Sequence, residues 1–258
     1  DKKFVENESS DPSGRFCVGT PSVSDGQLLF LQHMISKMEP SGSRIGVLFN
    51  GSTSFTGDSG SGESEIRKWI IENDMLETVI QLPDKMFFNT PITTYIWIVT
   101  NKKNSLRKGK VQLIDGSKFF KPLRKKQNEK GNEITEDHIE KIIKTYKEFT
   151  ENQICKIYEN SHFGYTKITI ETPRKENGVI QKKKSGELIP DKHCRKYERV
   201  PLSQSIEDHF TSEIKPFSKD SWINESLNKV GYEINFIKYF YKPYKFSPLD
   251  IVSEKFKK

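Results

Sequence analysis

The spacing of apolar residues predicts a helix and then a strand near the start of the chain. Ser24 is the expected N-cap of the helix, because Gln27 lies three residues on, as in a capping box. Residues 40–42 (Pro-Ser-Gly) end the helix, and residues 44–49 read as a buried strand. Residues 1–23 lack periodicity and are expected to form a loop. The apolar face of the helix comprises Leu28, Leu31, Met34, Ile35 and Met38.

The next segment continues this alternation of helices and strands. A helix is expected to start near Gly62, followed by strands at 76–82 and 92–100. The run 92–100 is almost continuously apolar, β-branched and aromatic, which is typical of a strand covered on both faces. Residues 110–115 alternate and are expected to form an edge strand. The order predicts an α/β sheet with too few strands for a complete doubly wound domain.

The second half of the chain is patterned more weakly. Thr135 caps a predicted helix, and residues 166–171 alternate as a strand. Residues 172–200 are polar and basic without periodicity, so we expect a linker. The tail, 201–258, mixes prolines with aromatic residues and is expected to form short helices and extended pieces that pack on something else. The apolar face of the helix comprises Ile139, Ile142, Ile143, Tyr146 and Phe149.

Positive charge is concentrated in one block. The chain has 258 residues, of which 33% are hydrophobic and 30% charged, and a net charge of +7. Residues 101–130 contain eleven Lys and Arg against two acids, giving +9, so the other 228 residues sum to −2. Such a block is either an electrostatic footprint for a polyanion or a solvated lysine-rich loop. A second basic stretch, 173–199, reads as a linker with its own charge.

Cysteine usage and hydropathy indicate a soluble, cytoplasmic protein. The three cysteines lie far apart without paired spacing, which argues against a disulfide framework and for a reducing compartment. His193 and Cys194 are adjacent, but no second ligand pair has zinc spacing, so no metal site is expected. The longest strongly apolar run, 95–99, is far too short to cross a bilayer, and the first residues are polar and charged.

A glycine-rich stretch, residues 50–63, joins a predicted strand to a predicted helix. It is a poor phosphate cradle, because position 65 is glutamate and no lysine follows the last glycine. "GDSG" at 57–60 resembles the nucleophile stretch of chymotrypsin-like proteases, but the only upstream histidine, His33, lies inside a predicted helix. We favour a flexible loop at the strand edge where open α/β sheets bind ligands, with a surface connection as the alternative.

Several segments, in order, resemble the modification subunit of type I restriction–modification systems. They are residues 24–101 ("SDGQLLFLQHM…IWIVTN"), "HFGYTKITIETP" (162–173), "RKYERVPL" (195–202) and "KVGYEINFIKYFY" (229–241). That family transfers a methyl group from S-adenosylmethionine to adenine N6 in DNA. The resemblance implies a Rossmann-like methyltransferase sheet followed by a mixed helical tail.

Two motifs of that family are absent from this chain. It contains no Pro-Pro dipeptide, and thus no Asn-Pro-Pro-aromatic motif, and no strand-glycine turn-helix of the cofactor-binding kind. In the family both motifs lie upstream of the region that this chain resembles. We therefore expect the C-terminal half of the methyltransferase sheet, inactive alone and with no catalytic residue of its own. The alternative hypothesis is a non-catalytic DNA-binding or subunit-assembly module.

The resemblance also implies site residues. Phe30 occupies the position of an aromatic that packs on the adenine of S-adenosylmethionine, although core packing is equally compatible with its place in the helix. Phe87 and Phe88 precede the strand where the family carries an aromatic that stacks on the flipped base, and one of the two is expected to be core. Asn50 lies at the same edge. Within the basic block, Lys125 and Lys126 are candidates for contact with DNA.

Family resemblance further implies partners and a division of the chain. Expected partners are DNA, a specificity subunit, a second modification subunit and the restriction subunit, without a membrane. The segment 232–246 is the expected docking element, with packing on its own domain as the alternative. The expected parts are 1–116, the half methyltransferase domain; 117–172, a basic loop with a helical extension; and 173–258, a basic linker and docking tail.

Overall fold

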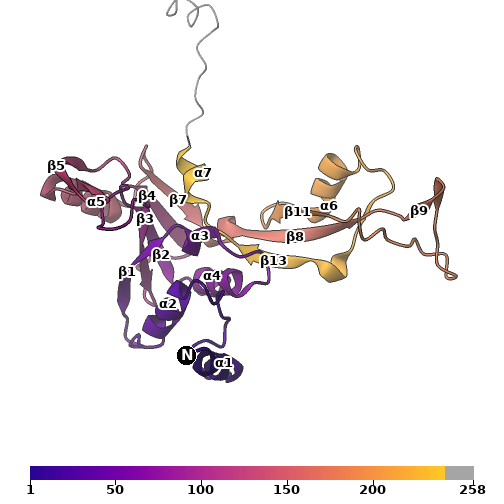
Figure 1. Cartoon of the computed structure of the whole chain (residues 1–258), viewed down its shortest axis with the longest axis horizontal. Helices are drawn as coiled ribbons and strands as arrows, with labels where there is room; N and C mark the ends of the chain where they lie inside the picture. The colour runs from indigo at the N-terminus through magenta and orange to yellow at the C-terminus, as the bar shows by residue number, and fades with distance from the viewer. Residues whose placement is uncertain (242–258) are drawn as a thin grey trace, which may run out of the picture.

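Two large β-sheets and two two-stranded hairpins organise residues 1–241 (Figure 1). The computed structural model describes residues 1–241, apart from the side chain of Lys126. Its helices are α1 (Lys2–Ser10), α2 (Gln27–Ile35), α3 (Ser52–Phe55), α4 (Gly62–Glu72), α5 (Glu136–Glu148), α6 (Ile206–His209) and α7 (Phe236–Phe240), with short helical turns at Asn160–Phe163, Phe210–Ile214 and Glu225–Leu227. Its strands are β1 (Arg44–Asn50), β2 (Leu76–Gln81), β3 (Thr94–Thr100), β4 (Lys110–Asp115), β5 (Lys121–Gln127), β6 (Lys130–Glu133), β7 (Cys155–Glu159), β8 (Gly164–Glu171), β9 (Lys175–Glu176), β10 (Val179–Ile180), β11 (Lys196–Pro201), β12 (Trp222–Ile223) and β13 (Lys229–Tyr232).

The first sheet has the order β1-β3-β2-β4-β7 and helices on both faces. β1, β2 and β4 run parallel to one another, whereas β3 and β7 are antiparallel to their neighbours. Trp97 and Val99 of β3 pack with α2 and α4, and Ile96 and Ile98 face the cluster that contains Ile142 of α5. This arrangement confirms the prediction that residues 92–100 form a strand covered on both faces.

The two outer strands of this sheet differ from the predictions. β1 is not buried: it is an edge strand, and only Phe49 is fully covered, while Leu48 is 43% exposed. β4 is not an edge strand, because β7 pairs with it along Lys110–Ile114. β7 was not predicted, since its five residues, CKIYE, are too short and too polar to show a clear period.

The second sheet forms around the long strand β8. β11, β12 and β13 all pair with it in antiparallel register. One face buries Ile168, Ile170 and Val200 against Ile206 and Phe210, which follow β11. The expectation of an aperiodic linker over 172–200 is wrong in part, because β11 and the small β9–β10 hairpin lie there. The hairpin projects from the far end of the second sheet (Figure 1).

The N-terminal segment also departs from the predictions. Residues 2–10 form α1, which buries none of its side chains and therefore shows no apolar period in the sequence. The N-cap of α2 is Gly26 rather than Ser24, and the Asp25 side chain accepts a hydrogen bond from the Gln27 backbone N–H at 3.2 Å. α5 begins as predicted, with the side chains of Thr135 and His138 forming a capping box. Among residues 1–241, no helix has the length and apolar character to cross a membrane.

Candidate functional site

Three loops that follow the parallel strands of the first sheet lie at the same edge of that sheet. β1, β2 and β4 end at Asn50, Gln81 and Asp115, so the loops that follow them leave the same side of the sheet. We call this side the carboxyl edge. In open α/β sheets it is where ligands bind, because strand ends and helix starts leave a crevice there.

A polar cluster lies at this edge between α2 and β1. The Asn50 backbone N–H donates to Gln27 Oε1 at 3.0 Å, and the Ser52 backbone N–H donates to Asn50 Oδ1 at 3.0 Å. The Ser52 hydroxyl donates to Asp25 Oδ2 at 2.7 Å, and the Gln27 amide donates to Asp25 Oδ1 at 2.8 Å. Asn50 is thus held in place by a network centred on a carboxylate.

Asp25 was not among the residues predicted from the sequence. Burial acts to raise the pKa of its carboxyl group, but the hydrogen bonds from Ser52 and Gln27 outweigh it, so the pKa is lower than usual. The group is therefore ionised at neutral pH and can accept hydrogen bonds from hydroxyl or amino groups, whereas it would repel a phosphate. Its position before a helix, two residues from Gln27, was the available signal.

Phe30 lies on the exposed side of α2. Leu28 and Leu31 of the same helix are buried in the core, whereas Phe30 is 71% exposed. Core packing, one of the two interpretations of Phe30, therefore does not describe its surroundings. A large exposed aromatic ring on the helix that begins at the carboxyl edge is available to pack on a planar ligand.

Phe87 and Phe88 lie in the loop between β2 and β3. Phe88 is 54% exposed, and Phe87 is partly buried and forms an isolated β-bridge with Thr90. The Lys130 ammonium group lies 5.1 Å from the centre of the Phe88 ring. Of the two rings, Phe88 is thus the one placed for contact with a partner, beside a positive charge.

The β5–β6 hairpin is attached to this loop. The backbone N–H groups of Gly131 and Asn132 donate to the Lys85 carbonyl at 2.9 and 3.1 Å, and the Asn132 amide donates to the Asp84 carbonyl at 2.9 Å. The hairpin carries Lys125, which is exposed. The side chain of Lys126, on the same strand, lies outside the described residues. The structure thus brings the basic hairpin and Phe88 together at the carboxyl edge.

The basic block does not act as a single surface. Lys103 and Arg107, near its start, are buried at the opposite edge of the sheet. Lys103 Nζ lies 2.6 Å from Asp74 Oδ1, and Arg107 Nη1 donates to Gln112 Oε1 at 2.9 Å. These two cations stabilise the fold, and the part of the block that faces solvent at the carboxyl edge is the hairpin.

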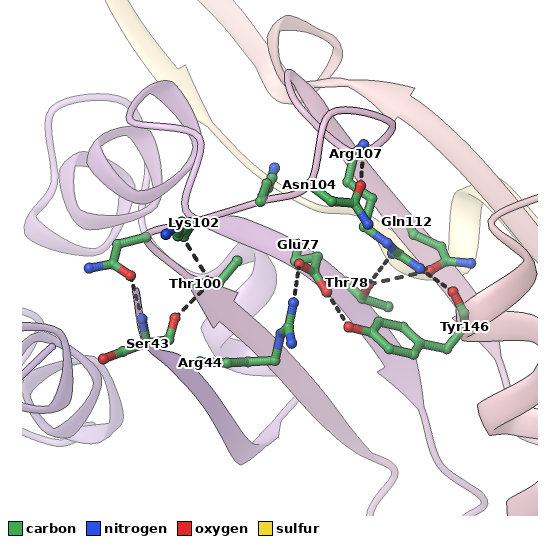
Figure 2. A network of polar contacts seen from close by, with 12 residues as sticks. Ser43, Arg44, Glu77, Thr78, Thr100, Lys102, Asn104, Arg107, Gln112 and Tyr146 are labelled. Atoms are coloured by element: carbon green, nitrogen blue, oxygen red, sulfur yellow. Dashed lines mark hydrogen bonds and ion pairs between the residues drawn. The ribbon is translucent and has the colours of Figure 1, made fainter. Parts of the chain in front are cut away.

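That opposite, amino edge holds a closed polar network (Figure 2). Glu77 is fully buried, and its carboxylate accepts hydrogen bonds from Arg44, at 3.1 Å, and from the Tyr146 hydroxyl. The Arg107 guanidinium group also donates to the Tyr146 carbonyl and lies 4.4 Å from the centre of its ring. Every ionised group of this network has a partner, so it is a structural element rather than a ligand site.

The glycine-rich loop is fixed between the two sheets. The Arg67 side chain is buried and donates to the carbonyls of Tyr232 (2.7 Å), Thr53 (3.1 Å) and Gly57 (3.4 Å). Because the guanidinium group is buried and no carboxylate of residues 1–241 is bonded to it directly, desolvation lowers the pKa of Arg67 to about 10. The Ile234 backbone N–H also donates to the Ser54 carbonyl at 2.8 Å. These hydrogen bonds hold the loop in place between the two sheets, so it is not the flexible loop that we expected.

The same contacts argue against nucleophilic chemistry in this loop. The Ser59 hydroxyl is buried and makes no hydrogen bond with any described residue, so no base activates it. Asp58 instead forms ion pairs with Lys167 and Arg199 of the second sheet. Gly57 and Gly60 adopt φ values of +87° and +81°, which glycine adopts without strain and which let the chain fold back here.

Comparisons with known proteins point to one family. The N-6 DNA methylase family model matches residues 1–180. A type I restriction enzyme methylase subunit of Methanocaldococcus jannaschii (MjaIX) is 30% identical over 164 residues, which are 63% of this chain and 27% of that protein. The HindI methylase subunit of Haemophilus influenzae is 28% identical over 235 residues, 88% of this chain and 48% of that protein.

A solved structure agrees with the sequence comparisons. The methyltransferase subunit of a type I restriction-modification system from Streptococcus thermophilus superposes with a TM-score of 0.51 at 28% sequence identity. The match covers 61% of this chain and 31% of that one. The fold is thus that of a methyltransferase-like α/β sheet, and the chain spans less than half the length of the two curated relatives.

Proposed function

The chain belongs to the N-6 DNA methylase family, and on that premise we propose that it is part of the DNA methylation subunit of a type I restriction–modification system. The whole subunit would transfer a methyl group from S-adenosylmethionine to adenine N6. The observation that carries this proposal is the carboxyl edge, where exposed Phe30, exposed Phe88 and the basic hairpin leave the same side of a methyltransferase-like sheet. Alone, the chain is expected to be inactive.

The free side of β1 supports the interpretation of an incomplete sheet. Within residues 1–241, β1 pairs with β3 on one side only, and α2, which precedes it, covers one face of the sheet. A strand leading into α2 through a right-handed crossover would lie parallel to β1 on its free side. We propose that a segment outside this chain supplies that strand, together with the Asn-Pro-Pro-aromatic motif.

S-adenosylmethionine is the expected methyl donor, and its sulfonium group supplies the activated methyl. This chain offers part of its site: Phe30 provides a ring for the adenine to pack on, and the anionic Asp25 cluster provides acceptors for hydroxyl or amino groups. The glycine turn of the family is absent from the sequence. We therefore assign this chain one wall of the cofactor site.

For DNA, we propose that Phe88 stacks on the flipped adenine and that the hairpin contacts the backbone. A base must leave the duplex before its amino group can meet a methyl donor, and an exposed ring stabilises the extruded base by stacking. Lys125 and Lys126 would neutralise phosphates beside it without reading sequence. Asn50, held beside Asp25, lines the same edge.

Assembly is the remaining part of the proposal. Proposed partners are the specificity subunit, a second modification subunit and the restriction subunit, in the cytoplasm. Tyr232, Ile234 and Phe236 of the expected docking element pack into the core of this chain, so we propose that the exposed Ile237 and Tyr241 make the docking contacts. Residues 242–246 lie outside the described residues. The division at residues 116 and 172 remains a proposal, although β7 of the middle part completes the first sheet.

The first test is the coding sequence upstream of Asp1. An Asn-Pro-Pro-aromatic motif there, with a glycine turn further back, is expected. In the full product, Phe88→Ala should then lower kcat/KM for methyl transfer by roughly 5- to 150-fold, since stacking on a base contributes about 1–3 kcal/mol. Phe217→Ala, at a ring 89% exposed in the segment between β11 and β12, is the matched control and should leave the rate unchanged.

A start codon at or near Asp1 would contradict the enzyme proposal. The alternative, a DNA-binding or assembly module, would then be favoured by the basic hairpin. Unchanged methylation by the Phe88→Ala variant would remove Phe88 from the base site while leaving the family intact.

A further inference from the structure

A row of positive side chains crosses one face of the second sheet. In the antiparallel register, Arg199 of β11 lies opposite Lys167 of β8, and Lys229 of β13 lies opposite the same Lys167. Directly opposite residues share a face, so three cations stand side by side across three strands. Like charges in these positions destabilise a sheet unless anions lie among them.

The glycine-rich loop supplies part of the counter-charge. The Lys167 ammonium group pairs with Asp58, and Arg199 Nη2 lies 3.3 Å from Asp58 Oδ1. Arg199 is also paired with Glu233. Lys229, the third cation of the row, is exposed and forms no ion pair with residues 1–241. One end of the row is thus neutralised within the chain, and the other end is open.

A hollow of about 360 Å³ lies beside the open end. Lys167, Arg195 and Lys229 line it, and Asp58 is the sole carboxylate among its described lining residues. The Tyr197 ring forms part of the wall, is 53% exposed, and has the Lys167 ammonium group 4.3 Å from its centre. Three cations therefore converge on a solvent-accessible hollow. Lys167 is paired with Asp58, and the Arg195 guanidinium group donates to the buried Glu171 Oε1 at 3.0 and 2.6 Å. Of the three, Lys229 is the cation that has no carboxylate partner among residues 1–241.

We propose that this hollow binds a backbone phosphate of duplex DNA, with Lys167, Arg195 and Lys229 as its ligands and Asp58 as an internal competitor. Lysine and arginine are the usual partners of phosphate oxygens, and the exposed Tyr197 can pack on the neighbouring sugar. The inference rests on the proposed function only for the choice of DNA as the polyanion. The hollow belongs to the second sheet, so it is a contact separate from the β5–β6 hairpin.

The test is binding of a fluorescently labelled random-sequence duplex, followed by anisotropy from 50 to 200 mM salt. Lys229→Gln should reduce the slope of log K against log salt by about 0.9, the loss of one phosphate contact, so the loss of affinity should be roughly threefold larger at 50 mM than at 200 mM salt. Asp58→Asn should change both quantities in the opposite direction, because it removes the competing charge. Lys37→Gln, with the same change of charge at an exposed residue after α2, is the control.

The outcomes separate this site from the hairpin. If Lys229→Gln behaves like Lys37→Gln, or Asp58→Asn weakens binding while its thermal unfolding is unchanged, the hollow is not a phosphate site. If the Asp58→Asn variant does not fold, the salt slope of the Lys229→Gln variant alone decides whether the hollow binds a phosphate. Lys125→Gln, measured in the same series, reports on the hairpin, so either contact can fail without the other.

Discussion

The two edges of the first sheet differ in the burial of their side chains: charged groups are buried and paired at the amino edge, whereas a ring and a cation are exposed at the carboxyl edge. At the amino edge, Glu77 and Arg107 are buried, and each has a charged or hydrogen-bonding partner (Figure 2). Lys103 is buried there too and is paired with Asp74. At the carboxyl edge, Phe88 and Lys125 face solvent. Buried charges are tolerated only when they are paired, whereas exposed rings and cations add little stability and remain available to a ligand. Stability and binding are thus separated along the strands of one sheet.

The largest effect is expected from Arg107→Ala at the amino edge. The substitution leaves the Tyr146 carbonyl without its side-chain donor and leaves Gln112 Oε1 with only the 3.4 Å hydrogen bond from the Thr78 hydroxyl among residues 1–241. It also removes the guanidinium group packed on the Tyr146 ring. A buried acceptor left unsatisfied costs about 1–3 kcal/mol, so these two weakened acceptors together should lower the free energy of unfolding by up to about 6 kcal/mol. Urea unfolding measures it, with the exposed neighbour Lys108→Ala as control. Equal losses in both variants would show that the network is not structural.

Low pH should lower the free energy of unfolding by protonating Asp74, a carboxylate at the amino edge. Burial acts to raise the pKa of Asp74, but the hydrogen bonds from Lys103 and Asn160 outweigh it, so the folded-state pKa is lowered. A depressed carboxyl pKa adds stability above the unfolded value, about 3.9, that is lost as the pH falls through the folded value. Urea midpoints of the wild type should therefore drop below about pH 4. Asp74→Asn should show a shallower drop and lower stability at pH 7; parallel curves would refute this assignment.

Phe88→Ala tests whether exposed groups at the carboxyl edge contribute to binding rather than to stability. The ring is 54% exposed and contacts Lys130 at its face, so its removal should change the free energy of unfolding by no more than about 0.5 kcal/mol. Binding of a duplex with an abasic site opposite adenine, which eases extrusion of the base, should weaken markedly. Phe49→Ala, at a buried ring of β1, is the contrasting variant and should destabilise the fold by about 3–5 kcal/mol. A stability loss for Phe88→Ala near that size would make the ring part of the core.

The sequence predicted the features that depend on local patterns better than those that depend on pairing between distant segments. The strand 92–100 and the helix capped by Thr135 were correct because apolar period and cap chemistry are local signals. The status of β1 and β4 was wrong, since it depends on which strands pair beside them, and β7 gave little local signal. Arg67 and Asp25 were missed for the same reason: their partners, such as the Tyr232 carbonyl, lie far along the chain.

The smallest effect, and the one that isolates the hairpin, is expected from Lys125→Gln. The side chain is exposed, so the substitution should leave the free energy of unfolding within about 0.5 kcal/mol of the wild type. If Lys125 neutralises one phosphate, the slope of log K against log salt for duplex binding should fall by about 0.9, with no change in preference among sequences. An unchanged slope would show that Lys125 contacts no phosphate and that its charge serves only to keep the hairpin solvated. The carboxyl edge would then retain its exposed rings but lose its proposed contact with the DNA backbone.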